Sequence, residues 1–191
     1  SSTSRGLGDV YKRQVVLDRS LDRLRYLDDI FMGRVETVWS SAAALEEQVL
    51  DADLIIGAVL IPGAAAPKLV GLDLVRKLQK GSVMVDVAID QGGCFETSRA
   101  TSYEDPTYEI EGVVHYCVAN MPGGVARTAT LALTNATLPY VMRLADRGLD
   151  ALRSDPHFAL GLNVYAGRLT HQGVGEAFNF DTVSPEDALK V

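Results

Sequence analysis

The amino-acid sequence predicts an α/β protein built on a doubly wound, mostly parallel sheet. Two near-continuous apolar runs, residues 53–60 and 82–89, are typical of strands that are buried on both faces. They alternate with segments in which apolar residues recur at three- and four-residue steps, as in amphipathic helices. Strands and helices that alternate in this way, joined by right-handed crossovers, predict a sheet with helices on both of its faces.

The first half of that pattern begins at the short strand VVLD. We expect a helix capped by Ser20, with Leu21, Leu24 and Leu27 on its apolar side and Gly33 at its end. The later elements are a strand over 34–39, a helix over 42–52 capped by Ser40 or Ser41, a strand over 53–60, a loop over 61–68, a helix over 71–81, a strand over 82–89, a polar Gly-rich loop over 90–112 and a strand over 113–119.

Beyond the last of these strands the pattern changes. Residues 128–148 read as one long helix, with a possible kink near Pro139. The tail from Leu149 onward contains helix-like pieces and no further strand of the predicted sheet. We therefore expect the tail to pack on something other than that sheet.

The opening of the chain has a separate explanation. Residues 4–14, SRGLGDVYKRQ, place Gly6 and Gly8 before the strand that ends at Asp18. A dinucleotide-binding loop follows a strand, and its acid comes about 20 residues later, whereas ten positions separate Gly8 from Asp18 here. The eleven residues match the in-frame translation of a transposase-type sequencing adapter. We expect residues 1–14 to be adapter-derived, native sequence to start at Val15, and the chain to be a fragment.

Composition excludes several classes of protein. The formal net charge is −7, without the clustered Lys and Arg that nucleic-acid binding requires. No apolar run approaches the roughly 20 residues of a membrane-spanning helix. Two cysteines, Cys94 and Cys117, favour a reducing compartment, so we expect a cytoplasmic protein. Arg143 and Arg147 stand on the long helix where a metal site would need His or carboxylates, so we predict no metal site.

The predicted strand ends supply the candidate binding residues. Ligands of doubly wound sheets bind at the carboxyl ends of the strands, here Asp18, Val59-Leu60, Ala88-Ile89-Asp90 and Val118-Ala119-Asn120-Met121, which we expect in one line. Asp18 suits a ribose and would repel a 2′-phosphate; it also reads as an acid at a helix N-terminus. Arg23 and Ser40 lie near it in the sequence, and they also read as a solvated side chain and a helix cap.

Asp90 is the candidate catalytic residue. It follows a buried strand and precedes Gln91, Gly92 and Gly93, where the backbone can approach a ligand closely. A carboxylate with low-dielectric neighbours can relay protons; the alternative is an Asp that forms a turn before glycines. Asn120 suits either a ligand ring or a helix cap. The three histidines, His115, His157 and His171, read as structural or surface residues.

These motifs resemble the alanine dehydrogenase and transhydrogenase α-subunit family, and most closely its alanine dehydrogenases. The resemblance rests on VDVAIDQGGCFE with VANMPG, and it covers most of residues 15–148. It implies an incomplete NAD-binding Rossmann domain over 15–127, and a long helix with the C-terminal part of a substrate domain over 128–191. It also implies a homohexamer that converts L-alanine reversibly to pyruvate and ammonia. Asp90 would be catalytic, and the implied NAD contacts are Asp18, Arg23, Ser40, Val59, Leu60, Val87, Ala88, Ile89, Asp90, Arg99, Val118, Ala119, Asn120 and Met121.

The departures from the family leave alternatives open. The family's glycine loop is missing, as is the half that supplies a substrate-binding Arg and Lys and a catalytic His, so we expect the chain alone to be inactive. The truncation would expose the edge of the Asp18 strand and lower solubility. The alternatives are a transhydrogenase α-subunit with a membrane partner, a non-catalytic NAD-binding subunit, and a methyltransferase, which would leave Asp90 and Asn120 unexplained.

Overall fold

A computed structural model describes residues 13–59, 61 and 65–190 of the chain. The residues fall into two compact units, which we describe separately. The first comprises residues up to Val59 together with Pro67–Ala119, and the second comprises residues from Asn120 onward with the short segment before Pro67. The predicted domain boundary at residue 127 stays a prediction, and most of the predicted adapter segment, together with Leu60, lies outside the described residues.

The first unit begins with a parallel β–α–β element, as predicted. Strand β1 (Val15–Asp18) pairs with β2 (Glu36–Trp39), and the pairing places Asp18 opposite Trp39. Helix α1 (Leu21–Phe31) joins them and buries Leu24 and Leu27. Its cap is Ser20, whose hydroxyl accepts a hydrogen bond from the Arg23 N–H. Ser41 rather than Ser40 caps helix α2 (Ala42–Leu50), because its hydroxyl accepts from the Ala44 N–H.

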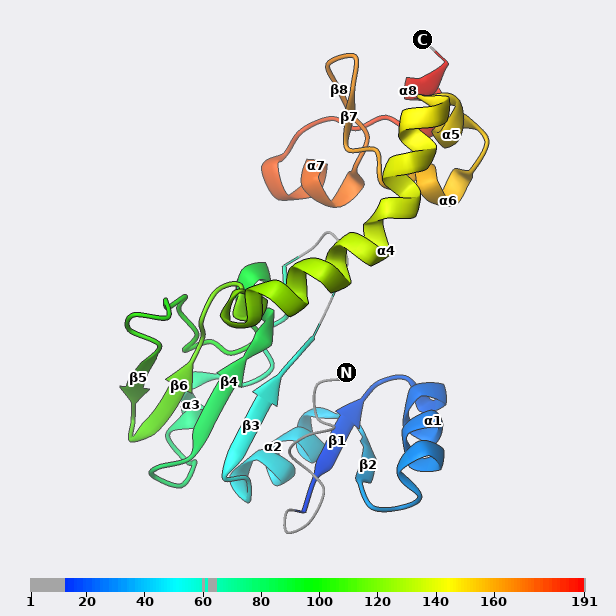
Figure 1. Ribbon diagram of the computed structural model, residues 1–191. Helices are drawn as coiled ribbons and strands as arrows, with labels where there is room; N and C mark the ends of the chain where they lie inside the picture. The colour runs from blue at the N-terminus through cyan, green and yellow to red at the C-terminus, as the bar shows by residue number, and fades with distance from the viewer. Residues whose placement is uncertain (1–12, 60, 62–64, 191) are drawn as a thin grey trace. The chain divides into compact units, whose positions relative to one another are not determined.

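The larger sheet of this unit has four strands in the order β3-β4-β6-β5 (Figure 1). Strands β3 (Leu54–Gly57), β4 (Val83–Asp86) and β6 (Val113–Tyr116) run parallel, and β5 (Thr107–Ile110) pairs antiparallel with β6. Met84, Phe95 and Val113 are among the core residues at this sheet. The sheet confirms the predicted α/β class with a parallel-dominated sheet.

Several predicted elements were wrong in extent; the strands predicted over 53–60 and 113–119, for example, are only β3 (Leu54–Gly57) and β6 (Val113–Tyr116). The strand predicted over 82–89 ends at Asp86, because the Asp86 carboxylate accepts from the Ala88 N–H and starts the 3₁₀ helix η2 (Val87–Gln91). The helix predicted over 71–81 is only α3 (Leu72–Val75), after which i→i−3 bonds tighten the backbone into turns. The loop predicted over 90–112 contains strand β5.

The strands of the first unit also divide between two hydrogen-bonded sheets where one was predicted, and the single line of strand ends stays a prediction. Among the described residues, β1 pairs with β2 alone and β3 pairs with β4 alone, so the parallel strands form two separate hydrogen-bonded sheets. Strand β3 also leaves Leu54 and Ile56 exposed. Among the described residues β1 has β2 as its one partner strand (Figure 1), and the truncation expected from the sequence stays a prediction.

The second unit is dominated by α4 (Ala126–Arg147), which follows the 3₁₀ helix η3 (Met121–Val125) and continues through Pro139. None of the side chains of α4 is buried, and its exposed apolar residues include Leu131, Leu133 and Val141. The tail adds the helices α5 (Asp150–Arg153), α6 (Pro156–Ala159), α7 (Gln172–Phe178) and α8 (Pro185–Leu189), and the hairpin of β7 (Val164–Tyr165) and β8 (Arg168–Leu169).

A small core holds that tail together. Leu152, Ala159 and Leu189 are buried against one another, and Arg143 of α4 donates to Asp155 at 2.9 Å. Within the part of the chain that is described, no helix combines the length and the apolar character that a membrane crossing requires.

Candidate functional site

The carboxyl ends of β1 and β2 and the first turn of α1 carry the residues predicted to bind the adenosine: Asp18 for its ribose, with Arg23 and Ser40 around the adenine. Asp18 is half-buried, and its Oδ1 accepts from the Ser20 N–H at 2.8 Å. The Ser40 N–H donates to the Asp18 carbonyl at 2.9 Å. Arg23, one turn into α1, places its guanidinium carbon 5.0 Å from the centre of the Tyr26 ring. Asp18 thus orders the helix start, one of the two roles considered from sequence, and it stands at a strand's carboxyl end, where its binding of a ribose stays a prediction.

A second set of candidate residues follows β4, around a carboxylate that the sequence reasoning did not single out. Asp86 is fully buried. Its Oδ1 accepts from the Ala88 N–H at 3.0 Å, and its Oδ2 accepts from the N–H groups of Cys94 and Phe95 at 2.8 and 3.3 Å. The Ser98 hydroxyl also donates to it. A buried carboxylate is stable only when such donors replace water, and here they come from both ends of one loop.

The loop around Asp86, residues 87–99, carries Asp90 near its start and Arg99 at its end. Asp90 is exposed in η2, not at the end of a buried strand as predicted. The Lys68 ammonium donates to the carbonyls of Gly92 and Gly93 at 2.6 and 2.9 Å and so holds the turn that follows Asp90. These contacts fix the backbone that presents Asp90 without using its carboxylate.

Close packing beneath the loop requires two glycines. A Cβ on Gly93, where φ is +74°, would lie 2.8 Å from the Asp86 Oδ2. A Cβ on Gly57, at the end of β3, would lie 2.2 Å from the Cys94 sulfur. Cys94 is fully buried, and burial, with the Asp86 carboxylate beside it, raises the pKa of its thiol to about 12. Cys94 therefore stays a neutral thiol that fills space between β3 and the loop.

Arg99 is held by an aromatic side chain from β5. Its guanidinium carbon lies 3.9 Å from the centre of the Tyr108 ring, and its backbone N–H donates to the Tyr108 hydroxyl at 2.8 Å. Tyr108 stacks in turn on His115 of β6. Burial lowers the pKa of His115, so its imidazole is neutral at pH 7. This agrees with the structural role predicted for His115.

The remaining predicted contacts divide between the two units. Val118 is buried and Ala119 exposed, and the Ala119 N–H donates to the Thr101 carbonyl at 3.2 Å, so the end of β6 meets the continuation of the Arg99 loop. In η2, Val87 is exposed while Ala88 and Ile89 are buried. Val59, half-buried, belongs to the same unit. Asn120, in the left-handed region at φ 53°, and Met121 belong to the second unit.

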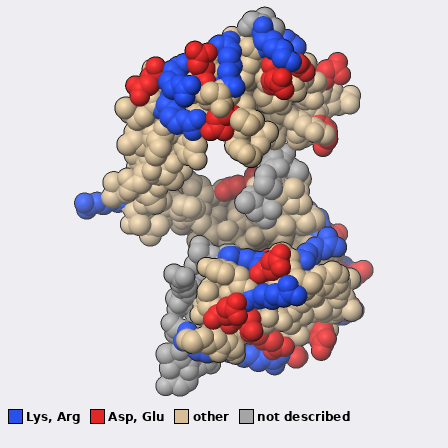
Figure 2. Space-filling view, turned by 90° about the vertical axis from the view of Figure 1, so that its right-hand side faces the viewer, with Lys and Arg blue, Asp and Glu red and all other residues tan. Residues whose placement is uncertain are grey.

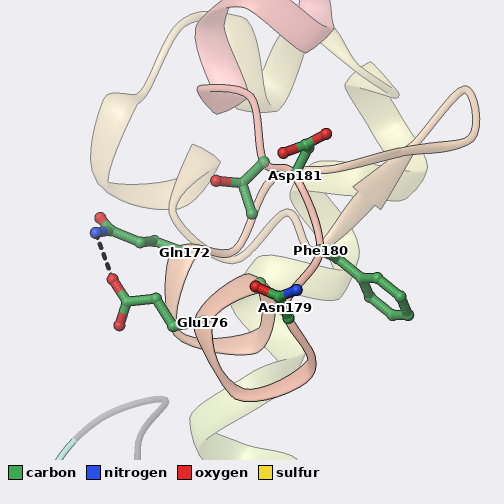
Figure 3. A pocket seen from close by; sticks show the side chains of 7 residues that line it. Gln172, Glu176, Asn179, Phe180 and Asp181 are labelled. Atoms are coloured by element: carbon green, nitrogen blue, oxygen red, sulfur yellow. Dashed lines mark hydrogen bonds between the residues drawn. The ribbon is translucent and has the colours of Figure 1, made fainter.

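The second unit contains a hollow of about 300 Å³, open to solvent, along α7 and the segment that follows it (Figure 3). Gln172 and Glu176 line it and hydrogen-bond each other at 2.7 Å, with Asn179, Phe180 and Asp181 on its other sides. On the face shown in Figure 2, basic and acidic side chains are interspersed. Across the described ranges, no group of three or more His, Cys, Asp or Glu residues could hold a metal ion.

Sequence reasoning missed three supporting residues: Asp86, Lys68 and Tyr108. A usable signal existed for Asp86, because a charged residue inside the apolar run SVMVDVAI must either be hydrogen-bonded or break the strand. Lys68 and Tyr108 gave no comparable signal, since their partners lie 24 and 9 residues away in the sequence.

Comparison with known proteins identifies the family of this chain. The family described as "Alanine dehydrogenase/PNT, C-terminal domain" matches residues 2–172 of the chain. The chain belongs to this family. It is 63% identical over 169 residues to an alanine dehydrogenase of Halomonas elongata, and 54% identical over 177 residues to one of Staphylococcus haemolyticus. These alignments cover 88% and 92% of the chain but only 46% and 48% of the relatives, so the chain spans about half their length.

Solved structures agree with the sequence relatives. An L-alanine dehydrogenase is 53% identical, with a TM-score of 0.77, over 87% of this chain and 46% of that one. A transhydrogenase from Sinorhizobium meliloti matches with a TM-score of 0.64 at 22% identity, which supports the Rossmann-type fold alone. The predicted resemblance to alanine dehydrogenases is thereby confirmed, and the homologues imply a nicotinamide cofactor.

Proposed function

We propose that this chain is the NAD-binding portion of an L-alanine dehydrogenase, a cytoplasmic homohexamer that converts L-alanine, water and NAD reversibly to pyruvate, ammonia and NADH. The observation that carries the proposal is the loop of residues 87–99. It presents Asp90 and Arg99 from a scaffold that is hydrogen-bonded at both ends to Asp86. Relatives that are 53–63% identical and named alanine dehydrogenase support this substrate.

The residues at the end of β1 fit the adenosine half of NAD. The Ser20 N–H orients the Asp18 carboxylate at the strand end, and a ribose offers two hydroxyl donors to such a group. Arg23 and Ser40 would border the adenine. Because a carboxylate repels a 2′-phosphate, Asp18 favours NAD over NADP.

The other predicted contacts would hold the nicotinamide half. Arg99 would donate to cofactor oxygens, and the remaining contacts would be made largely through backbone atoms of the strand-end segments 59–60, 87–90 and 118–121. We place no catalytic metal in this mechanism.

The chemistry that NAD would supply when bound is a hydride acceptor for the substrate Cα. Asp90 is the residue of this chain that we assign to catalysis: its exposed carboxylate would position the attacking water or relay a proton. The Lys68 contacts to Gly92 and Gly93 would keep that carboxylate in place, because a general base must remain within hydrogen-bond reach of the proton it moves.

The test is to extend the gene upstream of Val15 from its source DNA and assay the resulting protein for alanine-dependent NADH formation. We expect activity with NAD, and Asp90→Asn should lower kcat by about 10²-fold or more while NAD still binds. Asp29→Asn, an exposed acid on α1, is the matched control and should leave kcat unchanged. A protein that binds NAD but does not oxidise alanine would instead support a non-catalytic subunit, and activity that needs a membrane partner would support a transhydrogenase.

A further inference from the structure

Tyr108 contacts Arg99 in two independent ways. The face of its ring lies against the guanidinium, 3.9 Å from the ring centre to the guanidinium carbon, and its hydroxyl accepts the Arg99 backbone N–H at 2.8 Å. The same hydroxyl donates to the Thr97 carbonyl at 2.9 Å. One side chain therefore holds the backbone of the loop at residues 97–99 together with the charged end of Arg99.

Tyr108 is itself anchored in the core. It lies directly opposite His115 in the antiparallel pairing of β5 with β6, and the two rings stack with centres 5.0 Å apart and planes 17° apart. His115 is fully buried and bonded through both ring nitrogens, to the Val113 carbonyl at 2.9 Å and the Thr97 hydroxyl at 2.7 Å. An exposed arginine is thus connected to the sheet through two stacked rings.

This arrangement suits the recognition of an anion. Arginine side chains carry a large rotamer entropy, and ordering them on binding weakens affinity. A guanidinium held against a ring face has already lost part of that freedom, while the N–H groups on its edge can still donate to a ligand oxygen. The antiparallel β5, which the sequence did not predict, supplies the ring.

We propose that Tyr108 is a positioning residue for the dinucleotide site: it holds Arg99 so that the guanidinium contacts the oxygens of bound NAD. The inference rests on the proposed function, in that it takes NAD as the ligand. It assigns to the β5–β6 hairpin a role in cofactor affinity beyond completing the sheet.

A double-mutant cycle on this chain tests the proposal, with NAD affinity measured by isothermal titration calorimetry. Arg99→Gln should weaken NAD binding about tenfold, as expected for the loss of a charge-assisted contact. Tyr108→Leu should weaken it about threefold, because binding would then have to immobilise a freer Arg99 side chain. In the Arg99→Gln background, Tyr108→Leu should cause no further loss, because Tyr108 acts through Arg99.

Two further variants separate positioning from folding. Tyr108→Phe keeps the ring and should retain most of the affinity. Tyr116→Leu makes the same truncation on the opposite face of β6, since side chains alternate along a strand, and should leave the affinity unchanged. Circular dichroism melts confirm that each variant is folded.

The outcomes of these measurements distinguish failure of the positioning role of Tyr108 from failure of the proposed function. If the unmodified chain binds NAD and Arg99→Gln weakens binding, but Tyr108→Leu has no effect or adds in full to Arg99→Gln, the positioning role is refuted and the proposed function stands. If the folded, unmodified chain does not bind NAD at all, the proposed cofactor role of the chain is refuted, and this inference with it.

Discussion

Removing the Asp86 carboxylate should release the loop that carries both Asp90 and Arg99. In Asp86→Ala, three backbone N–H groups, those of Ala88, Cys94 and Phe95, lose acceptors that now lie 3.0, 2.8 and 3.3 Å away. A buried donor left without a partner costs about 1–3 kcal/mol. Because the 3.3 Å bond is the weakest and the loop can partly relax, we expect a total loss of about 3–5 kcal/mol in the free energy of unfolding.

Urea unfolding and hydrogen exchange measure the two parts of this effect. The midpoint of the first unit's transition should fall, and the amides of Cys94 and Phe95 should exchange faster than in the unmodified chain by a larger factor than those of β2. Asp90→Ala is the control, since Asp90 is exposed and its loss should change the unfolding free energy by less than about 1 kcal/mol. A loss below about 1 kcal/mol in Asp86→Ala, with Cys94 still protected, would refute the account of Asp86 as the centre of the loop.

Three further predictions follow from the same region. Both Gly92 and Gly93 have positive φ, but of the two only Gly93 lacks room for a Cβ. Urea titrations should therefore show Gly93→Ala to be about 1–3 kcal/mol less stable than Gly92→Ala. Equal losses of stability in the two variants would contradict the close approach of the Gly93 Cα to the Asp86 carboxylate. Native protein should react with a thiol reagent only on the timescale of unfolding, because Cys94 and Cys117 are buried and burial raises the pKa of Cys94; rapid labelling of either would contradict this. The folded pKa of His115 lies below its ordinary value of 6.5, so as pH falls the unfolded chain binds a proton first, and the stability that is full above pH 6.5 decreases below it. The free energy of unfolding of His115→Phe should therefore decrease less between neutral pH and about pH 5. An equal decrease in the variant and the unmodified chain would contradict the lowered pKa of His115.

The parts of the fold that sequence predicted well are those fixed by local chemistry. The strand before Asp18 and the caps at Ser20 and Ser41 need only an apolar run or a hydroxyl next to a helix, and the structure confirms them. The long helix was equally clear, and it continues through Pro139. In these cases the determining contacts lie within a few residues along the chain.

The predictions that were wrong concern elements whose extent depends on contacts between segments distant in the sequence. The strand predicted over 82–89 was cut short by one carboxylate whose partners include Cys94 and Phe95. Strand β5 has only four residues and is defined by its pairing with β6. The tail hairpin turns at Ala166 and Gly167, both with positive φ, and no turn was predicted there.

The candidate site divides in the same way. Asp18, Asp90 and Arg99 could be named because each has a recognisable place beside a strand or motif. The side chains that hold these residues could not be predicted, because they come from other strands. The ring against Arg99 belongs to Tyr108, which in turn stacks on His115. The candidate site residues could thus be named from the sequence, while the side chains that hold them became visible only in the folded structure.

The central claim, that this chain binds NAD through Asp18, is tested most directly by comparing its affinities for NAD and NADP. We predict that NAD binds at least about tenfold more tightly, because the 2′-phosphate would meet the Asp18 carboxylate, and that Asp18→Asn removes most of this preference. Equal affinities in the unmodified chain, or a preference for NADP, would contradict the claim.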